Sequence, residues 1–184
     1  MRVIAGTARS LPLKTPEGMD TRPTTDRIKE TLFNMLQTEI TDSIFVDLFS
    51  GSGGIGIEAL SRGAEHAYFI ENGKKAAACI RQNLEFTKFT DRATLLMQDV
   101  AGAISLIREE AVDIIYMDPP YQEGYEERVL QLLAEQAYVT VHTLIVVEAV
   151  LAKDFSFVKE LGYRIVKEKN YKTNKHIFLK RQEE

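Results

Sequence analysis

Four acidic side chains in this sequence end or follow short apolar runs that are typical of buried strands. They are Asp47, Glu71, Asp99 and Asp118. Ligands of open α/β sheets bind outside the carboxyl ends of the strands, so we expect the four acids to lie together at that edge. One such acid alone would be interpreted as a helix cap, but acids at four strand ends favour a ligand site.

The sharpest chemical signal is the run Asp118-Pro119-Pro120-Tyr121. Two consecutive prolines fix the backbone, so the Asp118 side chain and the Pro119 carbonyl are held rigidly at the sheet edge. Both groups are hydrogen-bond acceptors, and together they can receive the two hydrogens of an exocyclic NH2 group. Tyr121 presents a flat face on which an extruded base can stack. We therefore expect this run to form the reacting part of the site.

A glycine-rich turn follows the first apolar run. Its glycines are Gly51, Gly53, Gly54 and Gly56. Without a Cβ atom, this backbone can adopt positive φ and approach a ligand directly. A strand that passes through such a turn into a helix is the nucleotide-binding opening of a doubly wound α/β domain. Glu71 lies about 20 residues further on, where a carboxylate can accept both hydroxyls of a ribose.

Apolar runs and helical stretches alternate along most of the chain. Strands are expected over residues 44–49, 67–70, 93–97, 112–117 and 143–148, with helices between them. After a short helix over residues 153–161, two last strands, 163–169 and 176–180, are expected to form a hairpin. The alternation predicts a doubly wound, mainly parallel seven-stranded sheet with helices on both faces and a C-terminal antiparallel hairpin.

An N-terminal extension, residues 1–42, is expected to precede this domain of residues 43–184. Residues 2–13 are expected to form a β-hairpin, in which Pro12 restricts the second run to an edge strand. A helix then begins after Thr24 or Thr25, either of which can cap it.

Composition and charge limit the class of protein. Of 184 residues, 45% are apolar and 27% are charged, which is typical of a globular domain. No apolar run approaches the ~20 residues of a membrane helix, and the single cysteine, Cys79, suits a reducing cytosol. The net charge is -4, but Lys and Arg gather in residues 1–30 and 159–181. Local fields decide where a polyanion docks, so these segments predict RNA contacts, with a solvated lysine-rich surface as the alternative.

Taken together, the motifs resemble those of one bacterial family. The similarity rests on the stretch Thr21-Arg-Pro-Thr-Thr-Asp-Arg-Ile-Lys-Glu-Thr-Leu-Phe33, the glycine turn and the Asp118-Pro-Pro-Tyr run. These motifs are similar to those of the RsmD family of Rossmann-like S-adenosyl-L-methionine-dependent methyltransferases. The resemblance covers nearly the full chain. It implies methylation of N2 of one guanine, guanine 966, in 16S ribosomal RNA, either naked or in a partly assembled small subunit. It also implies a cytoplasmic monomer with no membrane partner.

The same resemblance assigns roles to residues of this chain. Those implied to bind S-adenosyl-L-methionine are Asp47, Phe49, Gly51, Gly53, Glu71, Asn72, Asp99, Val100, Arg22 and Thr24. Those implied to be catalytic, by positioning guanine, are Asp118, Pro119, Pro120 and Tyr121. The N-terminal extension is implied to dock RNA and to cover the cofactor. No metal is expected, because His66, His142 and His176 lack ligand spacing.

Three other functions stay open on the sequence alone. An amino-methyltransferase that acts on another RNA, on DNA adenine or on protein glutamine would use related motifs. An NAD-dependent dehydrogenase would satisfy Gly51-x-Gly53-x-x-Gly56 but would leave the Asp118 run unexplained. A non-catalytic RNA-binding ribosome-assembly factor would not need an acid at every strand end.

Overall fold

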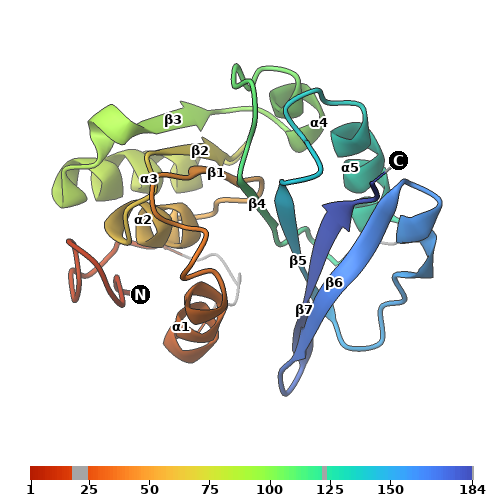
Figure 1. Ribbon diagram of the computed structural model, residues 1–184. Helices are drawn as coiled ribbons and strands as arrows, with labels where there is room; N and C mark the ends of the chain where they lie inside the picture. Colours follow the sequence, from red (N-terminus) through yellow and green to blue (C-terminus); the bar gives the residue numbers. More distant parts are fainter. Residues whose placement is uncertain (18–24, 122–123, 184) are drawn as a thin grey trace.

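The computed structural model describes residues 1–17, 25–121 and 124–183, and it shows a single twisted sheet of seven strands (Figure 1). The strands are β1 (Ile44–Asp47), β2 (His66–Ile70), β3 (Ala93–Leu96), β4 (Ile114–Met117), β5 (Leu144–Val150), β6 (Tyr163–Asn170) and β7 (Asn174–Arg181). Their spatial order is β3-β2-β1-β4-β5-β7-β6. The first five strands pair in parallel, and β7 runs antiparallel to both β5 and β6. The predicted sheet is confirmed.

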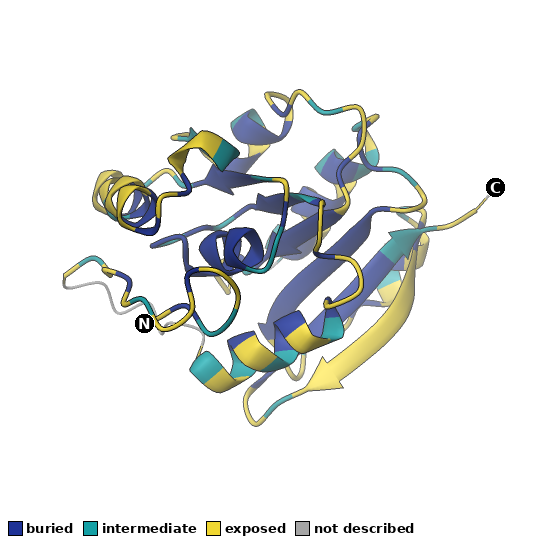
Figure 2. Cartoon of the chain, turned by 60° about the vertical axis from the view of Figure 1, so that its left-hand side comes forward, coloured by how far each residue is buried: buried dark blue, intermediate teal, exposed yellow. Residues whose placement is uncertain are grey.

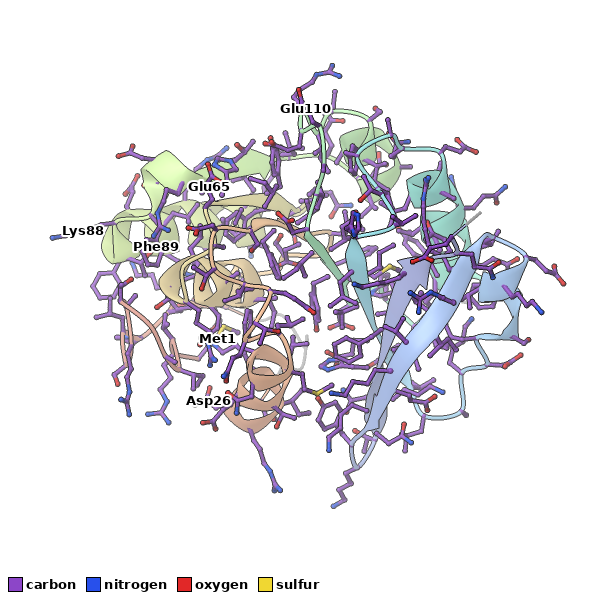
Figure 3. All side chains as sticks on the ribbon, viewed as in Figure 1. Met1, Asp26, Glu65, Lys88, Phe89 and Glu110 are labelled. Atoms are coloured by element: carbon purple, nitrogen blue, oxygen red, sulfur yellow. The ribbon has the colours of Figure 1, made fainter. Side chains whose placement is uncertain are left out.

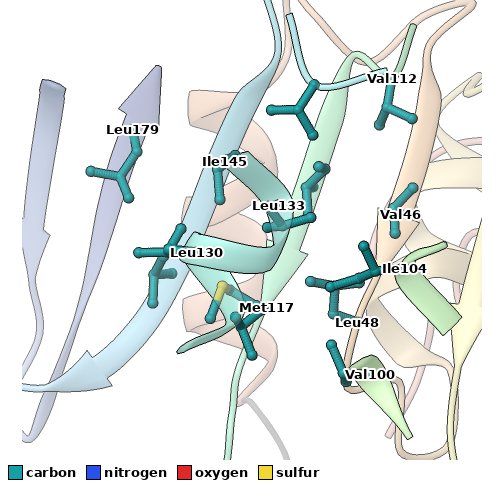
Figure 4. Close-up of a cluster of buried hydrophobic side chains, with 14 of the residues drawn as sticks. Val46, Leu48, Val100, Ile104, Val112, Met117, Leu130, Leu133, Ile145 and Leu179 are labelled. Atoms are coloured by element: carbon teal, nitrogen blue, oxygen red, sulfur yellow. The ribbon is translucent and has the colours of Figure 1, made fainter. Parts of the chain in front are cut away.

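Helices cover both faces of the sheet. They are α1 (Asp26–Met35), α2 (Gly54–Ser61), α3 (Lys74–Thr87), α4 (Val100–Ile104) and α5 (Tyr125–Ala134), with 3-10 turns η1 (Thr90–Arg92) and η2 (Ser156–Lys159). The first three helices pack on one face through residues such as Leu32, Ile57 and Ile80. Ile104 of α4 and Leu130 of α5 pack on the other face (Figure 4). Burial on both faces explains why the central strands are continuous apolar runs in the sequence.

Two stretches differ from their predicted form. Residues 2–13 fold back on themselves, but their arms meet in one antiparallel bridge, between Arg2 and Pro12, where a pair of strands was expected. Pro12 has no N–H group with which to extend a ladder. The helix predicted over residues 153–161 is reduced to η2, because Asp154 accepts hydrogen bonds from the backbone and hydroxyl of Ser156 and holds a turn there. Gly162, at φ +81°, follows this turn.

A buried carboxylate attaches the N-terminal extension to α2. Glu58 is fully buried and accepts hydrogen bonds from the backbone N–H groups of Ile4 (2.8 Å) and Ala5 (3.0 Å). The ammonium group of Lys29, from α1, lies 3.5 Å from Glu58 and donates to the carbonyl of Arg2. Burial lowers the pKa of Lys29, and the charge of Glu58 opposes that shift. Glu58 is also paired with Arg62 at 2.8 Å, so removal of Glu58 would leave the buried charge of Lys29 without its acidic partner. These contacts hold α1 and the leader, residues 1–17, beside α2. The division of the chain after residue 42 stays a prediction.

The last hairpin gives the sheet one exposed edge. Every residue of β6 after Tyr163 is exposed, whereas Asn174–Leu179 of the neighbouring β7 are buried (Figure 2). None of the helices within the described ranges is long and apolar enough to cross a membrane.

Candidate active site

A cleft of about 800 Å³ opens at the carboxyl ends of the central strands. Its walls come from the leader and the start of α1, the glycine turn with Glu71, the run from Asp118 to Tyr121, and the turn between β6 and β7. In Figure 1, α1 and the β6–β7 turn lie at the same end of the molecule. The volume is that of a small-molecule pocket, and the place is the one predicted for a ligand of a parallel sheet.

The leader contributes Met1 to the cleft wall. The side chain of Met1 lines the cleft close to the start of α1, whose first residue, Asp26, is also labelled in Figure 3. The hydroxyl of Ser52 in the glycine turn donates to the Met1 sulfur at 3.6 Å. A Cβ atom on Gly54 would lie 2.4 Å from that sulfur. The leader therefore rests directly on the glycine turn.

The helix that follows the leader begins where one of the predicted caps lies. The side chain of Thr25 accepts a hydrogen bond from the N–H group of Ile28 at the start of α1, and both residues line the cleft. Arg22 and Thr24 lie outside the described residues. Their contacts with a cofactor stay a prediction.

The glycine turn has the conformation that its sequence requires. Gly51 has φ +55° and Gly53 has φ +85°, which side chains with a Cβ atom adopt rarely. A Cβ atom on Gly56 would lie 2.4 Å from the ring of Phe69, so Gly56 lets α2 approach β2 closely. Phe49, which precedes the turn and lines the cleft, is packed edge to face against Tyr125 at 5.6 Å. The turn thus presents rigid backbone and the start of α2 to the cleft.

Glu71 lies at the end of β2 and faces this turn. One carboxylate oxygen accepts from the N–H group of Gly51 at 2.8 Å, and the other accepts from Gly73 at 2.7 Å. A carboxylate has about four acceptor positions, so the contacts of the described residues leave one on each oxygen for a ligand hydroxyl. Glu71 lines the cleft and is fixed by backbone donors before any ligand arrives.

Several predicted cofactor residues lie outside the cleft lining. They are Asp47, Gly53, Asn72, Asp99 and Val100. Asp47 is 1% exposed under the glycine turn, where burial raises its pKa to about 7 and the nearby amides of Phe49 and Gly56 oppose that shift. Neither oxygen of Asp47 has a partner at hydrogen-bond geometry among the described residues. Asp99 is exposed and caps α4 by accepting from Gly102 at 2.9 Å, and Val100 is buried in α4.

The Asp118 run lines the same cleft as Glu71 and follows β4, which is separated from β2 by β1. All four of its residues line the cleft, with Asp118 half-buried and Tyr121 65% exposed. Burial, and then the charges of Glu148 and Asp47, raise the pKa of Asp118 to about 8. The structure therefore brings together Phe49, Gly51, Glu71 and the whole Asp118 run.

One cleft acid, Glu148, was not among the predicted site residues. Glu148 is the last residue of the fifth predicted strand, and the other acids also lie at strand ends. This position in the sequence could have identified Glu148 as a site residue. Its oxygens take hydrogen bonds from the hydroxyl of Tyr116 (2.6 Å) and from the amide nitrogen of Asn174 (2.6 Å). Nε2 of His176 lies 3.1 Å from one of them. Among the described residues, no group of three His, Cys, Asp or Glu side chains is placed to hold a metal ion.

Comparison with known proteins gives one consistent family. Residues 1–180 match the family model described as conserved hypothetical protein 95. A protein of Haemophilus influenzae named ribosomal RNA small subunit methyltransferase D is 35% identical over 173 residues, which cover 92% of this chain and 88% of that protein. The Escherichia coli protein of the same name is 34% identical over 151 residues, covering 81% and 74% of the two chains.

A solved structure agrees with these sequence matches. The Escherichia coli protein yhhF superposes with a TM-score of 0.86 at 30% identity, over 99% of this chain and 98% of that one. The two sequence relatives are named as methyltransferases, and neither name supports the alternative function of an NAD-dependent dehydrogenase.

Proposed function

This chain belongs to the RsmD family, and we propose that it transfers a methyl group from S-adenosyl-L-methionine to the exocyclic N2 of a guanine in 16S ribosomal RNA. Guanine 966 is the specific target that we propose. The observation that carries the proposal is the position of the Asp118 run, which lines one cleft together with Glu71 and the glycine turn. The names of the Haemophilus influenzae and Escherichia coli relatives support ribosomal RNA as the substrate.

The cofactor half of the cleft suits a nucleoside without phosphates. The carboxylate of Glu71 keeps acceptor positions for ribose hydroxyls, and the turn at Gly51 leaves room for close backbone contact. Met1, Phe49 and Ile28 supply apolar walls. When bound, S-adenosyl-L-methionine supplies a methyl group on a positively charged sulfur, which is already a strong electrophile. The protein's task is therefore mainly to hold the acceptor in line with that methyl group.

The target half of the cleft suits an exocyclic amine. The lone pair of a guanine amino group is delocalised into the ring and is a poor nucleophile. Hydrogen bonds from N2 to the Asp118 side chain and the Pro119 carbonyl would draw the amine toward tetrahedral geometry and stabilise its developing positive charge. Tyr121 lines the cleft and is largely exposed, and we propose that it stacks on a base that has left its helix.

Exposed basic residues near the cleft offer contacts for RNA phosphates. Lys167 and Lys169 lie on the exposed edge strand β6, and Lys172 is exposed in the turn that follows it. The adjoining turn residue Thr173 and the first residue of β7, Asn174, line the cleft. We propose that this hairpin, together with the leader, docks the RNA around the target base.

Transfer of tritium from labelled S-adenosyl-L-methionine tests the proposed function. Three acceptors should be compared: naked 16S RNA, partly assembled small subunits and complete small subunits, each from cells that lack this activity. Label should enter at least one of them, and substitution of guanine 966 by adenine should abolish incorporation. Label that persists after this substitution would contradict the proposed target, and label that enters only protein would contradict the proposed substrate class.

A further inference from the structure

Glu148 stands beside Asp118 at the carboxyl edge of the sheet. Met117, the last residue of β4, is paired with Val147 of β5, and Asp118 and Glu148 directly follow these two residues. Neighbouring strands lie about 4.8 Å apart, so the two carboxyl groups start from adjacent positions on one edge. Both side chains line the cleft, although Glu148 is only 6% exposed. A base whose amino group meets Asp118 therefore has Glu148 next to it.

Three polar neighbours fix the orientation of the Glu148 carboxylate. The Tyr116 hydroxyl and Nε2 of His176 contact Oε2, and Asn174 donates to Oε1. Burial opposes ionisation of Glu148, but the hydrogen bonds from His176, Tyr116 and Asn174, with the electrostatic effect of His176, together hold its pKa below the usual range. With about two acceptor positions on each oxygen, the described residues fill both positions of Oε2 and one of the two on Oε1. Glu148 is a buried, ionised acceptor with one open position, and it lines the cleft.

We propose that Glu148 selects guanine by accepting the N1–H group of the target base while Asp118 accepts N2–H. This inference rests on the proposed function and names the residue that chooses the base. Guanine carries adjacent donors at N1 and N2 on its Watson–Crick edge. Adenine and 2-aminopurine present a lone pair at N1, which a fixed carboxylate repels. With either of these bases, the buried Glu148 carboxylate has no N1–H donor, which weakens binding. The site should therefore discriminate strongly against both bases.

The test replaces the target guanine by 2-aminopurine, which keeps the N2 amine but has no hydrogen on N1. We expect the wild-type protein to methylate guanine RNA at least about 10²-fold faster than 2-aminopurine RNA, the scale of one mismatched contact to a buried charge. In Glu148→Gln, the isosteric amide can donate to N1 of 2-aminopurine. The ratio of the two kcat/KM values should then fall at least about tenfold, because a hydrogen bond to a charged group is worth roughly that much or more. The analogue also lacks the 6-oxygen of guanine, but that loss is the same for both proteins and cancels when the ratios are compared.

Glu109→Gln is the matched control. Glu109 also accepts a tyrosine hydroxyl, that of Tyr68 at 2.7 Å, but it does not line the cleft. Its substitution should leave the guanine to 2-aminopurine ratio at the wild-type value. Cofactor affinity, measured by calorimetry, should be unchanged in both variants and confirms that each is folded.

Two results would overturn the role of Glu148. One is a wild-type protein that methylates both RNAs at similar rates, which needs no variant to be observed. The other is a Glu148→Gln protein that is slower on both RNAs by the same factor, which would indicate a general electrostatic role. Failure of the wild-type protein to methylate guanine RNA at all would instead contradict the proposed function, so the two failures are distinguishable.

Discussion

The two halves of the cleft hold their carboxylates by different means. On the β1–β2 side, Glu71 is fixed by backbone N–H groups, and glycines give the backbone its shape. On the β4–β5 side, Asp118 and Glu148 are neighbours, and their shared burial raises the pKa of Asp118 to about 8. Backbone N–H groups hold the Glu71 carboxylate rigidly for a ligand. The close approach of Glu148 instead changes the pH at which Asp118 loses its proton. Substitutions in the first half should change affinity, and those in the second should change rate and pH dependence.

The largest expected effect comes from the target half. Asp118→Ala removes an acceptor without altering the two prolines, so the fold and cofactor affinity should survive. Methyl transfer at saturating cofactor should fall about 10²–10³-fold, the scale of one well-placed polar contact in a transition state. Asp118→Asn keeps one acceptor oxygen and should retain measurable activity. Single-turnover kinetics measure the rate of methyl transfer, and calorimetry measures cofactor affinity. A loss of cofactor affinity with an unchanged transfer rate would contradict the assignment of Asp118 to the target half.

The next effect comes from the cofactor half. Glu71→Ala should weaken S-adenosyl-L-methionine binding by roughly 2–3 kcal/mol, because a charged acceptor of two hydroxyls is lost. Transfer at saturating cofactor should change little. Calorimetry gives the affinity, and an unchanged value would remove Glu71 from the site.

The pH profile should sharpen the contrast between the halves. Asp118 has a raised pKa, so its carboxyl is mostly protonated below about 8 and ionised above it. If the ionised form is the better acceptor, kcat/KM should rise about tenfold per pH unit up to about pH 8 and then level. Glu148→Gln removes a neighbouring negative charge and should move this rise to lower pH. Asp118→Asn should abolish the rise, and a rise that persists in that variant would assign it to another group, such as Asp47.

The smallest effect concerns the exposed hairpin. If Lys167, Lys169 and Lys172 contact phosphates, replacing all three by Gln should reduce the slope of log affinity for RNA against log salt by about 2–3. The exposed lysines Lys74, Lys75 and Lys88, at the two ends of α3, provide a matched control triple whose loss should leave the slope unchanged. A slope that changes only when Arg2 and Arg9 are replaced would make the leader the docking surface.

The parts of the site that sequence predicts are those set by local chemistry. Gly51, Glu71 and the Asp118 run follow apolar strands, and a parallel sheet brings the ends of such strands to one edge. Asp99 follows the same pattern but lies outside the cleft, where it caps α4. The pattern therefore finds the edge of the sheet, but it does not separate ligand-facing acids from helix caps.

What the sequence does not reveal depends on long-range pairing. Glu148 meets His176 and Asn174 only because β7 returns antiparallel beside β5, some 26 to 28 residues later. The ion pair between Lys29 and Glu58 is likewise invisible in the sequence, since Lys29 looks like a polar residue on an amphipathic helix and nothing local connects it with Glu58 in α2. Its role appears only when both side chains are found buried.

Identification of the modified nucleoside tests the central claim most directly. Small subunits that lack the modification should be treated with the protein and S-adenosyl-L-methionine, and their RNA digested to nucleosides and analysed by mass spectrometry against standards. We predict one new product, N2-methylguanosine, formed by the wild-type protein and about 10²–10³-fold more slowly by Asp118→Ala. A methyl group on another atom or base, or N2-methylguanosine formed by Asp118→Ala at the wild-type rate, would contradict the account.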